Sequence, residues 1–128
     1  MQQHNCSPLN DFIEYPADEM IARSEKFYQD IKRRHSIRNF SNRDVDKKII
    51  ENCLKAAGTA PSGANHQPWH FVAINSPTIK KQIRQQAEHH ERGFYNGRAG
   101  EEWLGALKEL GTDANKPYLE HAPWLIAI

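Results

Sequence analysis

The chain has 128 residues, of which 38% are hydrophobic, and this composition suits one domain with a modest core. Its 17 basic and 16 acidic residues nearly cancel, so the charge indicates neither a nucleic acid nor an anionic membrane surface as a partner. The two cysteines, Cys6 and Cys53, suggest no disulfide framework, and we expect Cys53 to be a small buried hydrophobe. No apolar run is long enough to span a bilayer, which favours a cytoplasmic protein.

Residues 1–16 are polar and interrupted by prolines, a pattern that predicts a flexible N-terminal leader. From Ala17 the apolar side chains recur at helical spacing up to a basic cluster at residues 32–34. This pattern predicts a helix with cations at its C-terminal end. We therefore expect a leader followed by one domain over residues 17–128.

A second helix is predicted after Asp44, which can act as its N-cap, and Gly58 is placed to end it. Its apolar stripe comprises Val45, Ile49, Ile50, Cys53, Leu54 and Ala57. A turn-rich segment then leads to Trp69–Ile74, whose short length and aromatic or β-branched content predict a buried strand.

Ser76 and Pro77 predict the start of a third helix, which we expect to end in the polar residues 88–92. The glycine-punctuated residues 93–100 are typical of a mobile segment, and a short amphipathic helix is predicted around Trp103–Leu110. The apolar run at residues 124–128 predicts the start of a second buried strand. Because the chain stops inside this strand, we expect it to be incomplete at the C-terminus.

The first candidate binding segment is Arg34-His35-Ser36-Ile37-Arg38, where cations and a hydroxyl leave a helix. Arginine can bind a phosphate with two hydrogen bonds, and a serine hydroxyl or a backbone N–H can complete the site. The alternative is a solvated basic helix end that the helix dipole stabilises. The residues alone leave both interpretations open.

The second candidate is the ten-residue loop Ala60–Trp69 between the predicted second helix and the first strand. Its small residues let the backbone approach a flat ligand, and Gly63 permits conformations that would strain other residues. The alternative is an ordinary connection in which Pro68 stops the helix and Trp69 fills the core.

These two segments resemble conserved elements of the nitroreductase superfamily. The first is similar to its Arg-Arg-Ser-Val-Arg element, and residues 58–64 with 67–69 are similar to its flavin-contacting loop. Within this superfamily, the sequence Gly-Thr-Ala-Pro-Ser-Gly-Ala at residues 58–64 is similar to the corresponding segment of iodotyrosine deiodinases. The resemblance runs from about residue 15 to residue 128.

The resemblance implies an α+β, nitroreductase-like FMN-binding fold with a helix-covered central sheet and a homodimer with FMN at the interface. It implies that Arg34, His35, Ser36, Ile37 and Arg38 hold the phosphate and ring edge of FMN. Pro61, Ser62 and Gly63 would line the isoalloxazine. His35 stands where the family more often has arginine, so one phosphate contact is expected to be pH-dependent.

The same resemblance assigns Glu91, Tyr95 and Lys116 to a substrate lid at about residues 88–117. Glu91 suits an ammonium group, while Lys116 and the Tyr95 hydroxyl suit a carboxylate, so together they would bind the zwitterionic end of a halotyrosine. The backbone N–H of Ala64 would meet the phenolate. Without the resemblance, the three charged or polar residues would read as ordinary solvated surface.

The histidines His89, His90 and His121 lie near carboxylates but lack the spacing of a metal site, so we expect no metal. The resemblance implies reductive dehalogenation of halotyrosines, with electrons ultimately from NAD(P)H. Two alternatives stay open: a general FMN nitroreductase or quinone-type oxidoreductase, and a truncated, non-catalytic binding or dimerisation module.

Overall fold

The structure is a computed structural model that describes residues 8–128 in two units, Met1–Ile37 and Arg38–Ile128. Residues 1–7, which include Cys6 and part of the predicted leader, lie outside the described residues. The predicted domain boundary after residue 16 stays a prediction.

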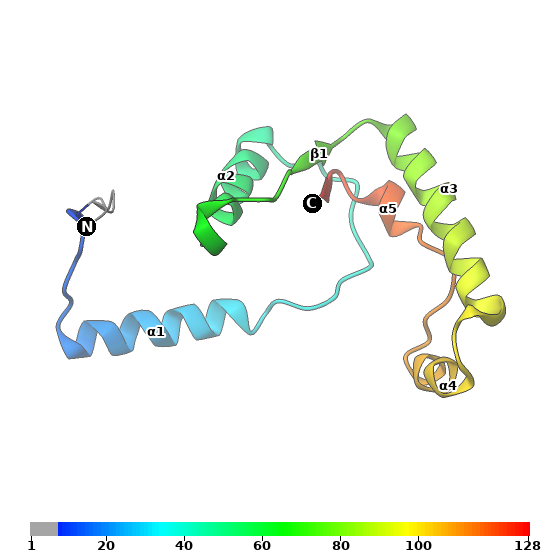
Figure 1. The fold of residues 1–128 in the computed structure, drawn as a ribbon, viewed down its shortest axis with the longest axis horizontal. Helices are drawn as coiled ribbons and strands as arrows, with labels where there is room; N and C mark the ends of the chain where they lie inside the picture. Colours follow the sequence, from blue (N-terminus) through cyan, green and yellow to red (C-terminus); the bar gives the residue numbers. More distant parts are fainter. Residues whose placement is uncertain (1–7) are drawn as a thin grey trace. The chain divides into compact units, whose positions relative to one another are not determined.

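The described part of the first unit contains one helix, α1 (Ala17–Ile31), drawn in blue in Figure 1. Glu19 forms an ion pair with Arg23, one turn further along the helix, with 2.7 Å between Oε1 of Glu19 and Nη2 of Arg23. The Arg23 guanidinium also lies 3.9 Å from the centre of the Tyr15 ring. The predicted helix start is confirmed, and the basic cluster follows directly after Ile31.

Helix α2 (Lys47–Gly58) begins the helical part of the second unit. Its N-cap is Asp46, whose carboxylate accepts a hydrogen bond from the Lys48 backbone N–H at 2.7 Å, so the predicted cap at Asp44 is wrong. The helix also contains no buried residue, and Cys53 is exposed rather than buried. The apolar stripe is present, but no described element covers it.

Strand β1 (Val72–Ile74) pairs antiparallel with β2 (Leu125–Ala127), with Ala73 opposite Ile126. The two predicted strands are thus confirmed in position and are shorter than expected. Their predicted burial is wrong, since Val72 is 54% exposed. A two-stranded sheet cannot cover its own faces, because three or more strands or a packed helix are needed to do so.

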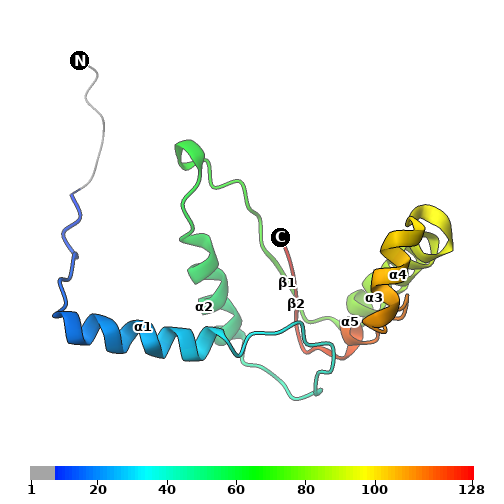
Figure 2. The same ribbon diagram turned by 90° about the horizontal axis from the view of Figure 1, so that it is seen from below.

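Helix α3 (Pro77–Gly93) begins where the sequence predicts, because the Ser76 hydroxyl accepts a hydrogen bond from the backbone N–H of Ile79. It does not end in residues 88–92 as expected. Arg84 and Glu88, one turn apart, form an ion pair that stabilises the last turns. The short helix α5 (Tyr118–His121) lies beside α3 in both Figure 1 and Figure 2.

The predicted mobile segment forms a π-helix, η2 (Phe94–Arg98), in which Gly97 adopts the positive φ of 136° that suits glycine. The Arg98 guanidinium donates to the carbonyl of His90 at 2.6 Å and thereby closes the turn. Helix α4 (Glu101–Glu109) follows, close to the predicted position.

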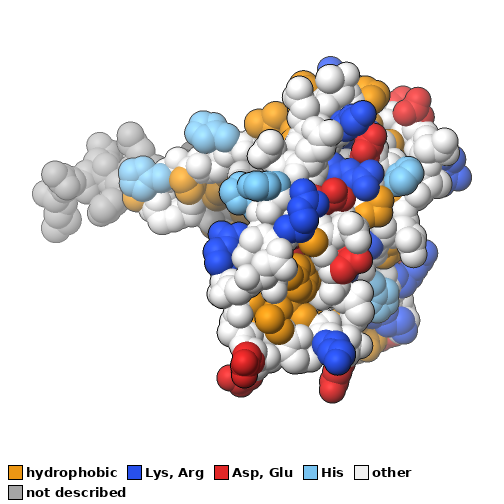
Figure 3. Space-filling view, turned by 90° about the vertical axis from the view of Figure 1, so that its right-hand side faces the viewer, with side chains coloured by type: hydrophobic (Ala, Val, Ile, Leu, Met, Phe, Trp, Pro, Cys, Tyr) orange, Lys and Arg blue, Asp and Glu red, His pale blue; other side chains and the backbone are white. Residues whose placement is uncertain are grey.

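Polar side chains connect these elements. Lys80 is only 6% exposed, and its ammonium donates to the carbonyls of Ala122 at 2.6 Å and Pro123 at 3.5 Å, which ties α3 to the segment before β2. The Trp124 indole N–H donates to the carbonyl of Val45 at 2.9 Å. Figure 3 shows basic and acidic side chains interspersed with exposed hydrophobic ones. Residues 38–128 are thus held together by polar contacts more than by a core.

The substitution Lys80→Met tests this connection, because methionine keeps the apolar stem and removes the donor. We expect the free energy of unfolding to fall by about 1–3 kcal/mol, since the Ala122 carbonyl stays buried without its hydrogen bond. Urea unfolding measures the change. Lys81→Met, at an exposed position of the same helix, is the control, and equal stability of the two variants would contradict the assignment.

Candidate functional site

The end of α3 and the start of α5 bring together two of the three predicted lid residues. The Lys116 ammonium lies 3.2 Å from Oε2 of Glu91, with side-chain exposures of 15% and 36%. An ion pair at this intermediate exposure is less screened than one fully in water. The structure therefore places the predicted cationic and anionic groups side by side.

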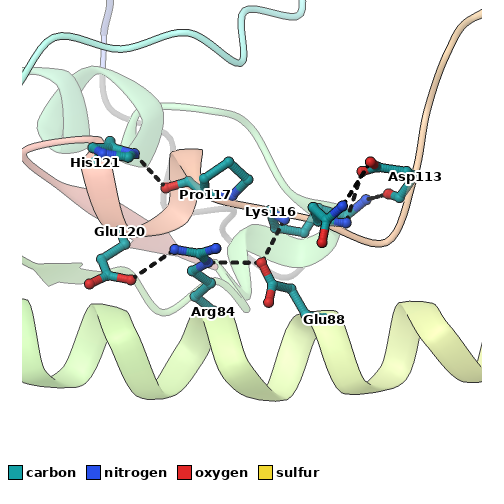
Figure 4. Close-up of polar contacts among 8 residues, drawn as sticks. Arg84, Glu88, Asp113, Lys116, Pro117, Glu120 and His121 are labelled. Carbon is teal, nitrogen blue, oxygen red and sulfur yellow. Dashed lines mark hydrogen bonds and ion pairs between the residues drawn. The ribbon is translucent and has the colours of Figure 1, made fainter.

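Lys116 is held by two further hydrogen bonds (Figure 4). Its ammonium donates to the Asp113 carbonyl at 2.7 Å, and its backbone N–H donates to Oε1 of Glu88 at 2.8 Å. The turn before it is closed by Asn115, whose side-chain amide and backbone N–H both donate to the Asp113 carboxylate at 2.8 Å. These two bonds lower the pKa of Asp113, the side-chain bond more than the backbone bond.

Arg84 connects two carboxylates from α3 and α5, as Figure 4 shows. Its Nε lies 2.8 Å from Oε1 of Glu88, and its Nη1 lies 3.2 Å from Oε2 of Glu120. The hydrogen bond from Arg84 lowers the pKa of Glu88, and the Lys116 backbone N–H lowers it further. The same bond to Glu88 raises the pKa of Arg84. Glu88 is thus charged and accepts from two elements at once.

The third lid residue, Tyr95, is linked to the same region through Thr112. The Tyr95 hydroxyl donates to the Thr112 hydroxyl oxygen at 3.0 Å. Thr112 lines a cavity of about 160 Å³ together with Lys116 and Arg38, the last residue of the predicted phosphate segment. The remaining lining residues are Leu110, Gly111, Asp113, Asn115 and Tyr118. One cavity therefore joins part of the predicted cofactor segment to the predicted lid.

The loop Pro61–Gln67 has a strained backbone in the region predicted to line the flavin. Positive φ angles occur at Ala64 (50°), Asn65 (54°) and Gln67 (43°). Gly63, whose lack of a side chain would permit such angles, does not adopt a positive φ. The Ser62 hydroxyl stabilises the turn by accepting the Gln67 backbone N–H at 2.8 Å. Such strain is concentrated at ligand-binding sites, where the surrounding structure maintains it.

The predicted phosphate segment is divided between the two units. Arg34, His35, Ser36 and Ile37 end the first unit, and Arg38 begins the second. All five are exposed, and none of the ion pairs formed within residues 8–128 involves them. Cations without a carboxylate partner suit an anionic ligand such as a phosphate group.

A larger cavity of about 860 Å³ lies elsewhere in the second unit, near Lys80, Arg84 and Trp124. None of the predicted site residues lines it, so cavity size does not identify the site.

In the part of the chain that the structure describes, no three His, Cys, Asp or Glu side chains gather as a metal site would require. No helix among these residues is both long enough and apolar enough to cross a membrane.

Sequence reasoning missed Arg84, Glu88 and Thr112. The spacing of Arg84 and Glu88, one helical turn apart, is a signal for their ion pair with each other. Their contacts with Glu120 and with the backbone of Lys116 join positions 36 and 28 residues apart. No local pattern predicts such pairs.

Residues 31–128 match the nitroreductase family, and the chain belongs to that family. Over 115 residues it is 47% identical to an iodotyrosine deiodinase of Haliscomenobacter hydrossis, a match that covers 90% of this chain and 52% of that protein. It is 44% identical to iodotyrosine deiodinase 1 of Homo sapiens over 114 residues, which covers 89% of this chain and 39% of that protein. The chain thus spans about half the length, or less, of the curated relatives it matches.

Solved structures agree with this fold. A crystal structure of oxidized iodotyrosine deiodinase bound to FMN and 3-iodo-L-tyrosine superposes with a TM-score of 0.71 at 34% identity, covering 77% of this chain and 53% of that chain. A BluB-like flavoprotein from Clostridium difficile superposes with a TM-score of 0.59 at 29% identity, covering 78% and 46%. The predicted α+β class and nitroreductase-like fold are therefore confirmed.

The lowered pKa of Glu88 predicts how acid affects this region. A carboxylate whose folded pKa lies below its unfolded value stabilises the fold above the unfolded pKa, and that contribution disappears as the pH falls through the folded value. We expect wild type to be more stable than Glu88→Gln at neutral pH, with a difference that narrows below about pH 4.5. Arg84 and Arg92, the cations acting on Glu88, stay charged throughout this range.

Urea unfolding of both proteins at a series of pH values measures this difference. A stability difference that stays constant down to about pH 3 would contradict the assignment, because a carboxyl with a lowered folded pKa loses its stabilising contribution once the unfolded chain takes up the proton.

Proposed function

We propose that this protein carries out FMN-dependent reductive dehalogenation of halotyrosines. The observation that carries the proposal is the Glu91–Lys116 ion pair, whose lysine lines the same cavity as Arg38 and Thr112. The similarity to iodotyrosine deiodinases over nine tenths of the chain supports the same function. The proposed products are tyrosine and halide.

The lid residues suit the amino-acid end of the substrate. Glu91 would accept the ammonium group, and Lys116 would bind the carboxylate together with the Tyr95 hydroxyl. In the structure Glu91 and Lys116 neutralise each other, so a zwitterion would exchange one ion pair for two. A ligand with one charge would leave one member of the pair without its partner. The pair therefore favours zwitterions over singly charged phenols.

The residues present fit FMN. Arg34 and Arg38 supply cations free of ion pairs within the described residues, and His35, Ser36 and Ile37 would complete the phosphate and ring-edge contacts. The flavin supplies the electrons that break the carbon–halogen bond, and the protein binds and orients the substrate.

The loop that would meet the flavin ring suits a flat ligand. Pro61, Ser62 and Gly63 would line the isoalloxazine, and a side-chain Cβ added at Gly63 would meet no atom within 4 Å, so the backbone there is open to a ligand. The Ala64 backbone N–H would bind the phenolate. The positive φ at Ala64 sets the direction of this peptide group.

The electron source, the assembly and the location are proposed from the resemblance to the family. NAD(P)H is proposed as the ultimate electron source, a homodimer as the assembly and the cytoplasm as the location. Residues 88–117 are proposed as a lid that excludes water over the substrate.

A flavin-fluorescence titration of purified, FMN-loaded protein with diiodotyrosine tests the proposal. We expect saturable quenching, and we expect Lys116→Ala to weaken binding by at least about tenfold, because it removes a charged hydrogen-bond donor. Lys81→Ala, at an exposed position on α3, is the matched control and should bind like wild type.

Each other result selects a different function. Bound flavin without quenching would favour a general FMN nitroreductase, which has no need to bind the amino-acid end. Protein that takes up no FMN would favour a non-catalytic binding or dimerisation module.

A further inference from the structure

We propose that Glu88 is a positioning residue that sets the affinity for the amino-acid end of the substrate by fixing the backbone of Lys116. Arg84 in turn orients Glu88. The inference rests on the proposed function, since it assigns Lys116 to the substrate carboxylate. Glu88 itself touches neither substrate nor cofactor in this scheme.

One oxygen atom of Glu88 makes the connection. Oε1 accepts from Arg84 Nε and from the Lys116 backbone N–H, both at 2.8 Å (Figure 4). The Glu88 side chain is 13% exposed, the least exposed carboxylate of the ion pairs among residues 8–128. A hydrogen bond of this length, with little solvent to compete for the N–H, restrains the position of the donor. This contact therefore restrains where the Lys116 backbone lies.

Helix α3 holds Lys116 at both of its ends. Glu88 binds its backbone N–H, and Glu91, three residues further along the same helix, pairs with its ammonium at 3.2 Å. Residues three apart lie on one face of a helix, so the two carboxylates are spaced by the helix itself. The helix thus fixes the spacing of the two carboxylates that hold Lys116. A shift of about 1 Å at such a site is enough to lower activity substantially.

Arg84 supports this arrangement from the other side. Its second contact, with Glu120 at 3.2 Å, binds α5, so the segment from Lys116 to Glu120 is tied to α3 at both ends. The Arg84 and Glu120 side chains are about one third exposed, which makes this contact the weaker of the two. The contact of Glu88 with Lys116 is therefore the stronger restraint, and Arg84 orients the Glu88 carboxylate toward the Lys116 backbone N–H.

The Glu88→Gln and Glu88→Asp variants separate geometry from charge. Glutamine keeps an acceptor oxygen at the same reach, whereas aspartate keeps the charge but withdraws it by one methylene from the Lys116 N–H. With diiodotyrosine as the probe and flavin fluorescence as the readout, we expect Glu88→Asp and Glu88→Ala to raise Kd about tenfold. Glu88→Gln should stay within about threefold of wild type.

Two further measurements show whether the effect passes through Lys116. In a Lys116→Ala background, Glu88→Asp should cause no additional loss, because coupled residues are not additive. An iodophenol, which lacks the amino-acid end, should bind each variant like wild type. Additive losses, equal affinities of the Asp and Gln variants, or a parallel loss of iodophenol binding would each overturn the proposal.

Hydrogen exchange of the Lys116 amide provides a readout that does not depend on substrate. We expect faster exchange in Glu88→Asp than in Glu88→Gln, and equal rates would contradict the positioning role. If wild-type protein bound FMN but not diiodotyrosine, the proposed function would fail while this amide still reported on Glu88. The Asp and Gln variants also decide the question if Glu88→Ala does not fold.

Discussion

The Glu88 carboxylate joins helix α3 to the segment before helix α5 by accepting from Arg84 and from the Lys116 backbone N–H, and the geometry of the candidate site depends on this link. Few side chains among the described residues are buried, so the hydrophobic effect does little to hold Lys116 in place. Charged hydrogen bonds do so instead, with Glu88 on the Lys116 backbone and Glu91 on its ammonium. The site is therefore organised by one helix that presents two carboxylates to one lysine.

Large apolar side chains remain exposed on several elements, including Ile49 on α2, Val72 on β1 and Trp103 on α4. The loop Pro61–Gln67, which we predict to contact the flavin, is also largely exposed and has a strained backbone at Ala64. Both features suit surfaces that bind a flat aromatic ligand or another protein surface, because exposed apolar area and stored strain are each costly without a function. By contrast, the Lys116 ammonium and backbone N–H already have hydrogen-bond partners within the chain.

Local sequence patterns predicted the elements well, since helices α1 to α4 and both strands lie close to where periodicity and turn residues placed them, although the cap of α2 and the end of α3 differ. They failed where the outcome depends on distant residues. Cys53 sits on a correct apolar stripe, yet burial needs a partner surface that α2 lacks. The lid pairing of Glu91 with Lys116 was reached through a family resemblance, whereas the part played by Glu88 became visible only when the fold brought it to the Lys116 backbone.

The most direct test of the account is to compare the affinities of three ligands for the FMN-loaded protein: iodotyrosine, its analogue without the carboxylate, and its analogue without the ammonium group. If Glu91 and Lys116 bind the two ends of a zwitterion, each analogue should bind at least about tenfold more weakly than iodotyrosine. If all three bind equally, the ion pair at the end of α3 does not recognise the substrate, and the account is wrong.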